Sequence, residues 1–158
     1  MSTRIVLVPG VPALLPEYAS LVDPVADLRA ACLAAVSWLG AEVTVLADRQ
    51  GERVAEALLA ATTREGDHPS YLVVGNGSAS RTEKAPGFLD ERSFGFDRDL
   101  RSWLDGAGPP LDTELGHEVG ASLTGFVLMA ERLTWAEPQV DYDDDPFGVQ
   151  YWVMRWTG

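Results

Sequence analysis

The residues best suited to chemistry lie in one loop, between positions 75 and 84. Gly75, Asn76 and Gly77 follow a short apolar run, and two serines and two cations come next. Consecutive backbone N–H groups of such a loop can cradle an anion, and neighbouring cations add charge. The spacing matches neither the Walker pattern, with its Lys directly after Gly, nor the complete dinucleotide fingerprint. The loop predicts a small-ligand site formed by these residues: Asn76, Ser78, Ser80, Arg81 and Lys84.

The alternative interpretation of this loop is a long connection whose charges are simply solvated. Its serines do not form a hydrolase nucleophile elbow, because Ser78 sits one place too late for the Gly-x-Ser-x-Gly pattern. The chain has two histidines, His68 and His117. His68 precedes a proline in a polar loop and is expected to be exposed. Glu114 and His117 have a metal-ligand spacing, but that motif needs a second copy and further carboxylates.

An acidic run at positions 141–145 imitates the start of a calcium-binding loop. Pro146 stands where such a loop requires glycine, and Trp152 stands where it requires glutamate. The run is therefore expected to be a solvated acidic loop. The single cysteine, Cys32, excludes an internal disulfide and a multi-cysteine zinc site, and its helical surroundings predict a buried small hydrophobe.

The composition limits the classes of function. The 158 residues predict one domain, residues 1–158, and the net charge of −12 argues against binding to nucleic acid or anionic membranes. No apolar stretch approaches the length of a membrane span, and no signal peptide opens the sequence. These features favour a cytoplasmic location.

The elements that must position the loop alternate between strands and helices. Apolar runs predict strands at 5–8, 43–46 and 71–74. A helix is expected to start at Asp23-Pro24 and to end before Gly40, and a turn at 48–51 is expected to precede a helix at 54–61.

The second half of the chain predicts further helices and a final strand. Asp90 or Ser93 can cap a helix that includes Leu100 and Leu104, and Asp112 or Thr113 can cap another before a weakly apolar segment at 121–133. The last strand, 148–156, is apolar on both faces, so it is either central in the sheet or covered by a partner chain. The alternation predicts a three-layer α/β/α domain with a mostly parallel sheet, whose sites lie at the carboxyl ends of its strands.

Four stretches, in order, resemble a known family. The run GNGSASRTEKAPGFLDERSFGFD at 75–97 resembles the Gly-Asp-Gly-Ser-Ala-Arg-Arg…Lys-Ala-Pro-Gly-Tyr-Leu-Asp…Phe-Asp segment of an actinobacterial group of proteins. That group is similar to the catalytic B subunit of class III extradiol dioxygenases, which open aromatic rings. Residues 9–17, 27–32 and 143–156 resemble the opening segment, first helix and closing strand of the same group.

The resemblance implies the fold of that catalytic subunit but not its metal site. Class III enzymes hold Fe(II) with two histidines and a glutamate, and a third histidine usually serves as acid and base. Here Gly10 stands where the first metal histidine belongs, and the second strand ends at Asp48 with no histidine nearby. Glu17 and Asp48 are carboxylates without an imidazole partner. We therefore expect no metal and no cofactor, and Gly10 and Asp48 join the candidate ligand-binding residues.

Two hypotheses remain open. The first is a non-catalytic, metal-free relative that binds a small molecule or a partner protein, with a homodimer formed through the last strand. The second is an enzyme. It is either an atypical Fe(II)-dependent oxygenase that opens a catechol-like ring, or a hydrolase-like activity using Ser78, Asp48 or His117.

Overall fold

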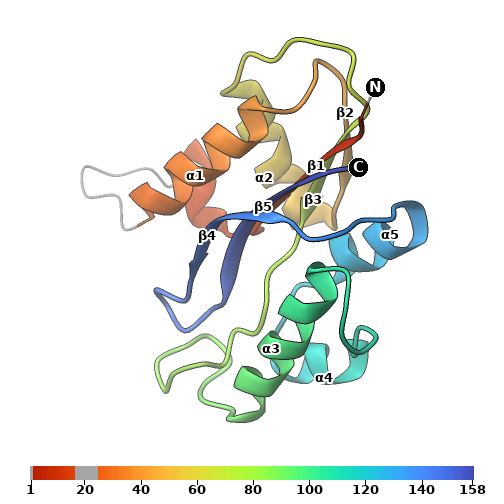
Figure 1. Ribbon diagram of the computed structural model, residues 1–158. Helices are drawn as coiled ribbons and strands as arrows, with labels where there is room; N and C mark the ends of the chain where they lie inside the picture. The colour runs from red at the N-terminus through yellow and green to blue at the C-terminus, as the bar shows by residue number, and fades with distance from the viewer. Residues whose placement is uncertain (1, 17–24) are drawn as a thin grey trace.

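A five-stranded sheet organises the computed structural model, which describes residues 2–16 and 25–158 (Figure 1). The strand order is β2-β3-β1-β5-β4. The strands are β1 (Arg4–Val8), β2 (Val43–Leu46), β3 (Ser70–Val74), β4 (Gln139–Asp144) and β5 (Tyr151–Thr157). The α/β class predicted from the sequence is confirmed.

The sheet is mixed in strand direction. β2, β3 and β1 are parallel to one another, with Val6 opposite Leu72 and Leu72 opposite Val45. β5 runs antiparallel to β1, and β4 runs antiparallel to β5. The short connection between β4 and β5 explains why these two strands are antiparallel, because a parallel pair needs a crossover of a dozen or more residues.

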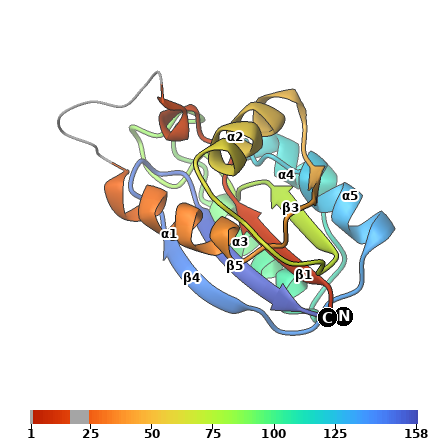
Figure 2. The same cartoon turned by 90° about the horizontal axis from the view of Figure 1, so that it is seen from above.

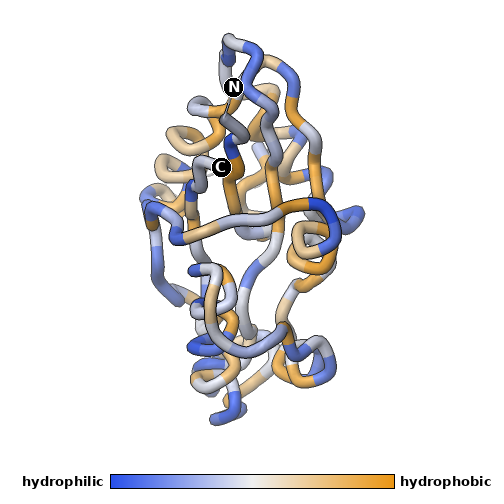
Figure 3. Tube along the Cα trace, turned by 45° about the vertical axis from the view of Figure 1, so that its right-hand side comes forward, coloured by the Kyte–Doolittle hydropathy of each residue, from blue (hydrophilic) through white to orange (hydrophobic). Residues whose placement is uncertain are grey.

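The helices pack against two hydrophobic clusters. They are η1 (Pro12–Leu14), α1 (Ala26–Ser37), α2 (Arg49–Ala60), α3 (Arg92–Leu104), α4 (Thr113–Glu118) and α5 (Thr124–Arg132). Alternate β1 residues face opposite ways, so Val6 joins α1 and α2 in one cluster, and Leu7 joins α3 and α5 in the other. The apolar segments accordingly lie along the strands in Figure 3.

Side-chain capping explains the starts of α2 and α4. Asp48 caps α2 by accepting a hydrogen bond from the Gly51 amide at 2.7 Å, so the predicted turn at 48–51 is the first turn of the helix. Asp112 caps α4 in the same way through the Leu115 amide. The predicted cap at Asp23-Pro24 lies outside the described residues.

The acidic run predicted as a loop is an edge strand, which corrects the sequence analysis. Within β4, Val140 packs against the hydrophobic cluster of α3 and α5, and Tyr142 packs against the cluster of α1 and α2. The aspartates mostly face solvent, which is typical of edge strands because charge there blocks pairing with other chains. Asp141 also forms an ion pair with Arg155 of β5 at 2.7 Å.

β5 lies inside the sheet, paired with β1 on one side and β4 on the other. Its burial on both faces is therefore explained within the chain and gives no reason to invoke a partner. At its far end, Thr3 and Gly158 exchange two backbone hydrogen bonds of 2.9 and 2.8 Å, so the chain ends lie side by side (Figure 2). No described helix is both long and apolar enough to cross a bilayer.

Candidate functional site

The loop that follows β3 is bound to two other parts of the chain. Asn76 pairs with Ser122, in the segment between α4 and α5, through two backbone hydrogen bonds. On the other side, Gly77 and Ser78 exchange backbone hydrogen bonds with Gln150, just before β5. The amides of residues 75–79 all donate to protein acceptors. These N–H groups are therefore occupied by the fold and are not directed at a ligand.

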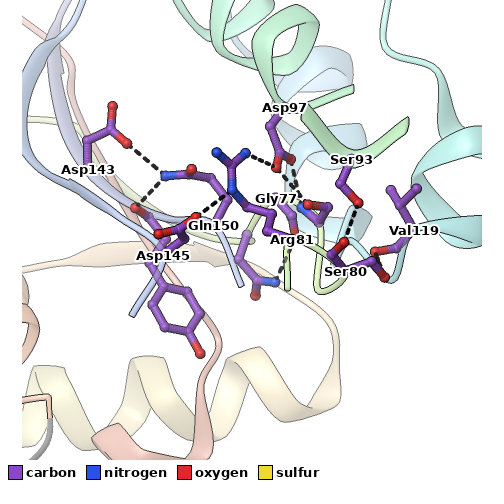
Figure 4. Close-up of polar contacts among 12 residues, drawn as sticks. Gly77, Ser80, Arg81, Ser93, Asp97, Val119, Asp143, Asp145 and Gln150 are labelled. Carbon is purple, nitrogen blue, oxygen red and sulfur yellow. Dashed lines mark hydrogen bonds and ion pairs between the residues drawn. The ribbon is translucent and has the colours of Figure 1, made fainter. Parts of the chain in front are cut away.

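Ser78 and Asp97 form the centre of a buried polar network, and Figure 4 shows Asp97 with its other partner, Arg81. The Ser78 amide donates to Asp97 Oδ1 at 2.7 Å, and the Ser78 hydroxyl donates to Asp97 Oδ2 at 2.6 Å. Only 4% of the Asp97 side chain is exposed. A buried carboxylate requires such donors, because its desolvation is otherwise costly. Ser78 thus has a structural role, because its hydroxyl is hydrogen-bonded to Asp97.

Arg81 connects this network to the turn between β4 and β5. Its Nη1 donates to Asp97 Oδ2 at 2.8 Å, and its Nε donates to Asp145 Oδ2 at 2.7 Å. Burial lowers the pKa of Arg81, but these two hydrogen bonds outweigh burial, so the net pKa is raised. The guanidinium carbon also lies 4.6 Å from the centre of the Phe94 ring. Arg81 is therefore fixed in place and charged.

The glycines of the loop allow these close approaches. A Cβ atom on Gly77 would lie 2.6 Å from Asp97 Oδ1 and 2.9 Å from Gln150 Cβ. A Cβ atom on Gly87 would collide with the Ser80 hydroxyl oxygen, and that hydroxyl donates to the Val119 carbonyl. Small residues in the loop are thus required by packing.

A pocket of about 270 Å³ opens beside Arg81. We call it the arginine pocket, and its lining residues are Arg81, Phe94, Asp97, Arg98, Arg101, Asp143, Gln150 and Trp152. At its rim, the Gln150 side-chain amide donates to Asp143 Oδ1 at 2.7 Å. The pocket combines three cations, two carboxylates and two aromatic side chains, so it is smaller and more polar than most small-molecule sites.

The predicted site residues do not all converge on this pocket. Arg81 lines the pocket, and Ser78 contacts it indirectly through its hydrogen bond to Asp97, which also lines it. Ser80 is buried in the wall of the loop, whereas Lys84 is exposed. The other candidates lie at the carboxyl ends of the parallel strands, with Gly10 after β1, Asp48 after β2 and Asn76 after β3.

Among the residues that the structure describes, the histidines and carboxylates do not assemble a metal site. His117 is exposed on α4, and the Nδ1 of His68 lies 3.2 Å from the Ser2 carbonyl oxygen. Asp48 is committed to capping α2, and Glu17 lies outside the described residues. Within the ranges 2–16 and 25–158, no group of three or more His, Cys, Asp and Glu side chains is arranged to hold a metal ion. The donors in these two ranges therefore do not fit the iron of an extradiol dioxygenase.

Sequence reasoning missed most of the pocket. Phe94, Asp97, Arg98 and Arg101 follow one another at helical spacing, so one face of α3 could have been found from the sequence. The contribution of Asp143 could not, because it lies 42 residues from Arg101 in a segment that was predicted as a loop.

Comparisons with known proteins add no relative. No family model, curated protein or solved structure matches the chain. The resemblance to the dioxygenase group therefore rests on the four sequence stretches alone.

Proposed function

We propose that this protein is a non-catalytic, metal-free relative of the class III extradiol dioxygenases that binds a small molecule in the arginine pocket. One observation carries the proposal: Arg81, held at 2.7–2.8 Å by Asp145 and Asp97, forms part of the wall of a pocket. A fixed cation beside an aromatic ring binds a ligand at little conformational cost, because few side-chain rotamers must be frozen.

The relationship to the fold of the dioxygenase catalytic subunit, with its three-layer α/β/α arrangement, is part of this proposal. Two features support it. The hydrophobic clusters lie against opposite faces of the sheet. The parallel strands β1 and β2 end at the same edge of the sheet, at the Gly10 and Asp48 positions that the resemblance aligns with the metal site.

Metal analysis separates this proposal from the oxygenase alternative. The protein is incubated anaerobically with Fe(II), desalted and analysed for its elements. We expect iron far below one equivalent, because Asp48 is a helix cap and the sequence places no histidine near it. Near-stoichiometric iron would overturn the metal-free proposal and direct attention to catechol substrates, with Asp48, Glu17 and His117 as the residues to substitute.

Ligand binding is tested with a small-fragment screen observed by two-dimensional NMR. Phe94→Ala removes one wall of the pocket, and Phe147→Ala is its matched control, because both rings are about equally exposed and Phe147 does not line the pocket. Fragments that bind should lose affinity in Phe94→Ala and keep it in Phe147→Ala. Lys84→Ala should also have no effect, since Lys84 lies outside the pocket. Equal binding by all three variants would contradict the assignment.

Protein interaction is a second candidate function, favoured by exposed apolar side chains, of which Phe94 also lines the pocket. Phe88 is 74% exposed, and the others are Leu89, Phe94 and Phe147. Phe88 also has a left-handed backbone, with φ of 57°, which a bulky residue rarely adopts. If these side chains join two copies of the chain, light scattering should give the mass of a dimer for the wild type and of a monomer for Phe88→Ser. A monomer in both cases would remove this candidate.

A further inference from the structure

The lining of the arginine pocket is richer in cations than the rest of this acidic protein. Three arginines, Arg81, Arg98 and Arg101, and two aspartates, Asp97 and Asp143, line it, which gives 3 − 2 = +1. The whole chain carries −12. Asp99, Asp105 and Asp145 pair with these arginines from outside the lining, so an anion would gain from the position of the guanidinium groups and not from an excess of positive charge.

The three guanidinium groups differ in how well they are satisfied. Arg81 makes two short hydrogen bonds, of 2.7 and 2.8 Å. Arg101 has loose partners: its Nη1 lies 3.5 Å from Asp143 Oδ2, and its Nε lies 3.4 Å from Asp105 Oδ1. That Nε atom is buried and has no partner with hydrogen-bond geometry. Asp105 Oδ1 is likewise buried without a partner of that geometry, and neither state is favourable. Within the pocket, the long Nη1 contact with Asp143 is the one that a new acceptor could improve.

Arg98 is also available to a ligand. It is on the same helix as Arg101 and is 78% exposed, with Asp99 at 3.6 Å. The acceptor nearest to Arg101 within the pocket, Asp143, already receives a 2.7 Å hydrogen bond from Gln150. Asp143 thus keeps a good partner if a ligand takes its place against Arg101.

The walls of the pocket favour an organic body over an inorganic ion. The Phe94 ring lies over Arg81 and is 46% exposed, and Trp152 lines the same space. A volume of about 270 Å³ accommodates a small molecule only. Asp97 and Asp143 would repel a second negative charge, and guanidinium groups bind planar carboxylates through paired N–H donors.

We propose that the arginine pocket binds a small monocarboxylate. Its carboxylate lies against Arg101, in the place that Asp143 Oδ2 now occupies, and its apolar body lies against Phe94. This inference rests on the proposed function and adds the chemical class of the ligand.

The test follows the arginine Nε–H signals by NMR while benzoate and butyrate are added to the full chain. Benzamide and butyramide are the neutral comparisons, because they keep shape and lose the charge. The carboxylates should shift the Arg101 Nε–H signal and bind about tenfold more tightly than the amides. Arg98→Gln should weaken carboxylate binding severalfold without affecting the fold, since that side chain is 78% exposed. Asp143→Asn should strengthen it.

Arg132→Gln is the matched control, because it makes the same change in net charge on α5, and Arg132 does not line the pocket. Equal weakening in Arg132→Gln and Arg98→Gln would mean a nonspecific charge effect and would overturn the proposal. Amides that bind as tightly as the carboxylates would overturn the carboxylate class and leave the ligand site standing. No shift with any of the four compounds up to about 50 mM would overturn the carboxylate proposal. The fragment screen then decides on the site separately.

Discussion

Ser78 binds Asp97 with two groups at once: its amide and its hydroxyl each donate to a different oxygen of the same carboxylate, at 2.7 and 2.6 Å. The two residues are 19 positions apart, so this pair closes the loop between β3 and α3. The same carboxylate also accepts a hydrogen bond from Arg81, the cation that lines the pocket. The residues that carry the family resemblance therefore hold the loop in shape, and Arg81 also lines the arginine pocket.

Removing the Ser78 hydroxyl should destabilise the fold. Ser78→Ala takes a hydrogen bond from a buried carboxylate, so we expect the free energy of unfolding to fall by about 1–3 kcal/mol. Urea unfolding followed by circular dichroism measures this. Ser37→Ala is the control, because Ser37 is exposed and bonds only to the carbonyl of its own helix, so it should change stability by less than about 0.5 kcal/mol. A Ser78→Ala change as small as the control would show that the pair does not hold the loop.

Two glycines should respond in opposite ways to alanine. Gly77→Ala places a methyl group 2.6 Å from Asp97 Oδ1, so it should destabilise the protein by about 1–3 kcal/mol through overpacking. Gly95 lies within α3, and a methyl group there meets only Arg98 Nη2, at 3.7 Å. Gly95→Ala should therefore raise stability by about 0.5–1 kcal/mol, because alanine favours a helix interior. Thermal unfolding of both variants tests the pair, and a shift in the same direction would contradict it.

Asp48 should behave as a helix cap. Asp48→Ala removes the acceptor of the Gly51 amide, which should lower the free energy of unfolding by about 1 kcal/mol. Asp48→Asn keeps an oxygen acceptor and should recover most of that loss. Neither variant should change binding in the arginine pocket, which Asp48 does not line. A loss of ligand binding with unchanged stability would instead place Asp48 in a binding site.

Stability should fall in alkaline solution because two buried groups keep their protons. Burial raises the pKa of Cys32 from 9.0 to about 12, with Arg29 acting weakly in the other direction, and burial raises the pKa of Tyr151 from 10.0 to about 12. The unfolded chain releases these protons at lower pH than the folded chain. The free energy of unfolding is therefore fully retained below pH 9 and declines as the pH rises towards 12.

Urea unfolding of the wild type and Cys32→Ala from about pH 8 to about pH 11 measures this linkage. The variant should lose less stability over that range, because one of the two groups is gone. Identical slopes for the two proteins would show that the Cys32 thiol does not contribute.

The sequence was informative where one physical signal dominates. The apolar runs of β1 and β3 predicted strands because these strands are buried inside the sheet, and β2 was predicted by its apolar residues although this edge strand is only partly buried. The start of α2 was missed because Gly51 suggests a turn, whereas in the fold it allows close contact with Val74 and Ala47. β4 was missed because its aspartates outweigh its two apolar residues, and only pairing with β5 makes it a strand.

The site was predicted only in part for the same reason. Arg81 stood out by its neighbours in the loop, and that residue does line the pocket. Its partners Asp97 and Asp145 are 16 and 64 positions away, so only the tertiary structure shows that its charge is already balanced. A polar residue can stand out in the sequence and still be paired in the structure. Its partners are distant in sequence, so local patterns do not reveal them.

The paired chain ends determine how this protein would yield to mechanical force. Thr3 and Gly158 lie side by side where β1 and β5 begin their antiparallel ladder. Tension applied between these two residues loads the ladder from one end and breaks its hydrogen bonds in succession, because bonds in an antiparallel pair run perpendicular to the strands. The chain should therefore unzip at low force by losing β5 from β1 first, even though both strands belong to the buried core.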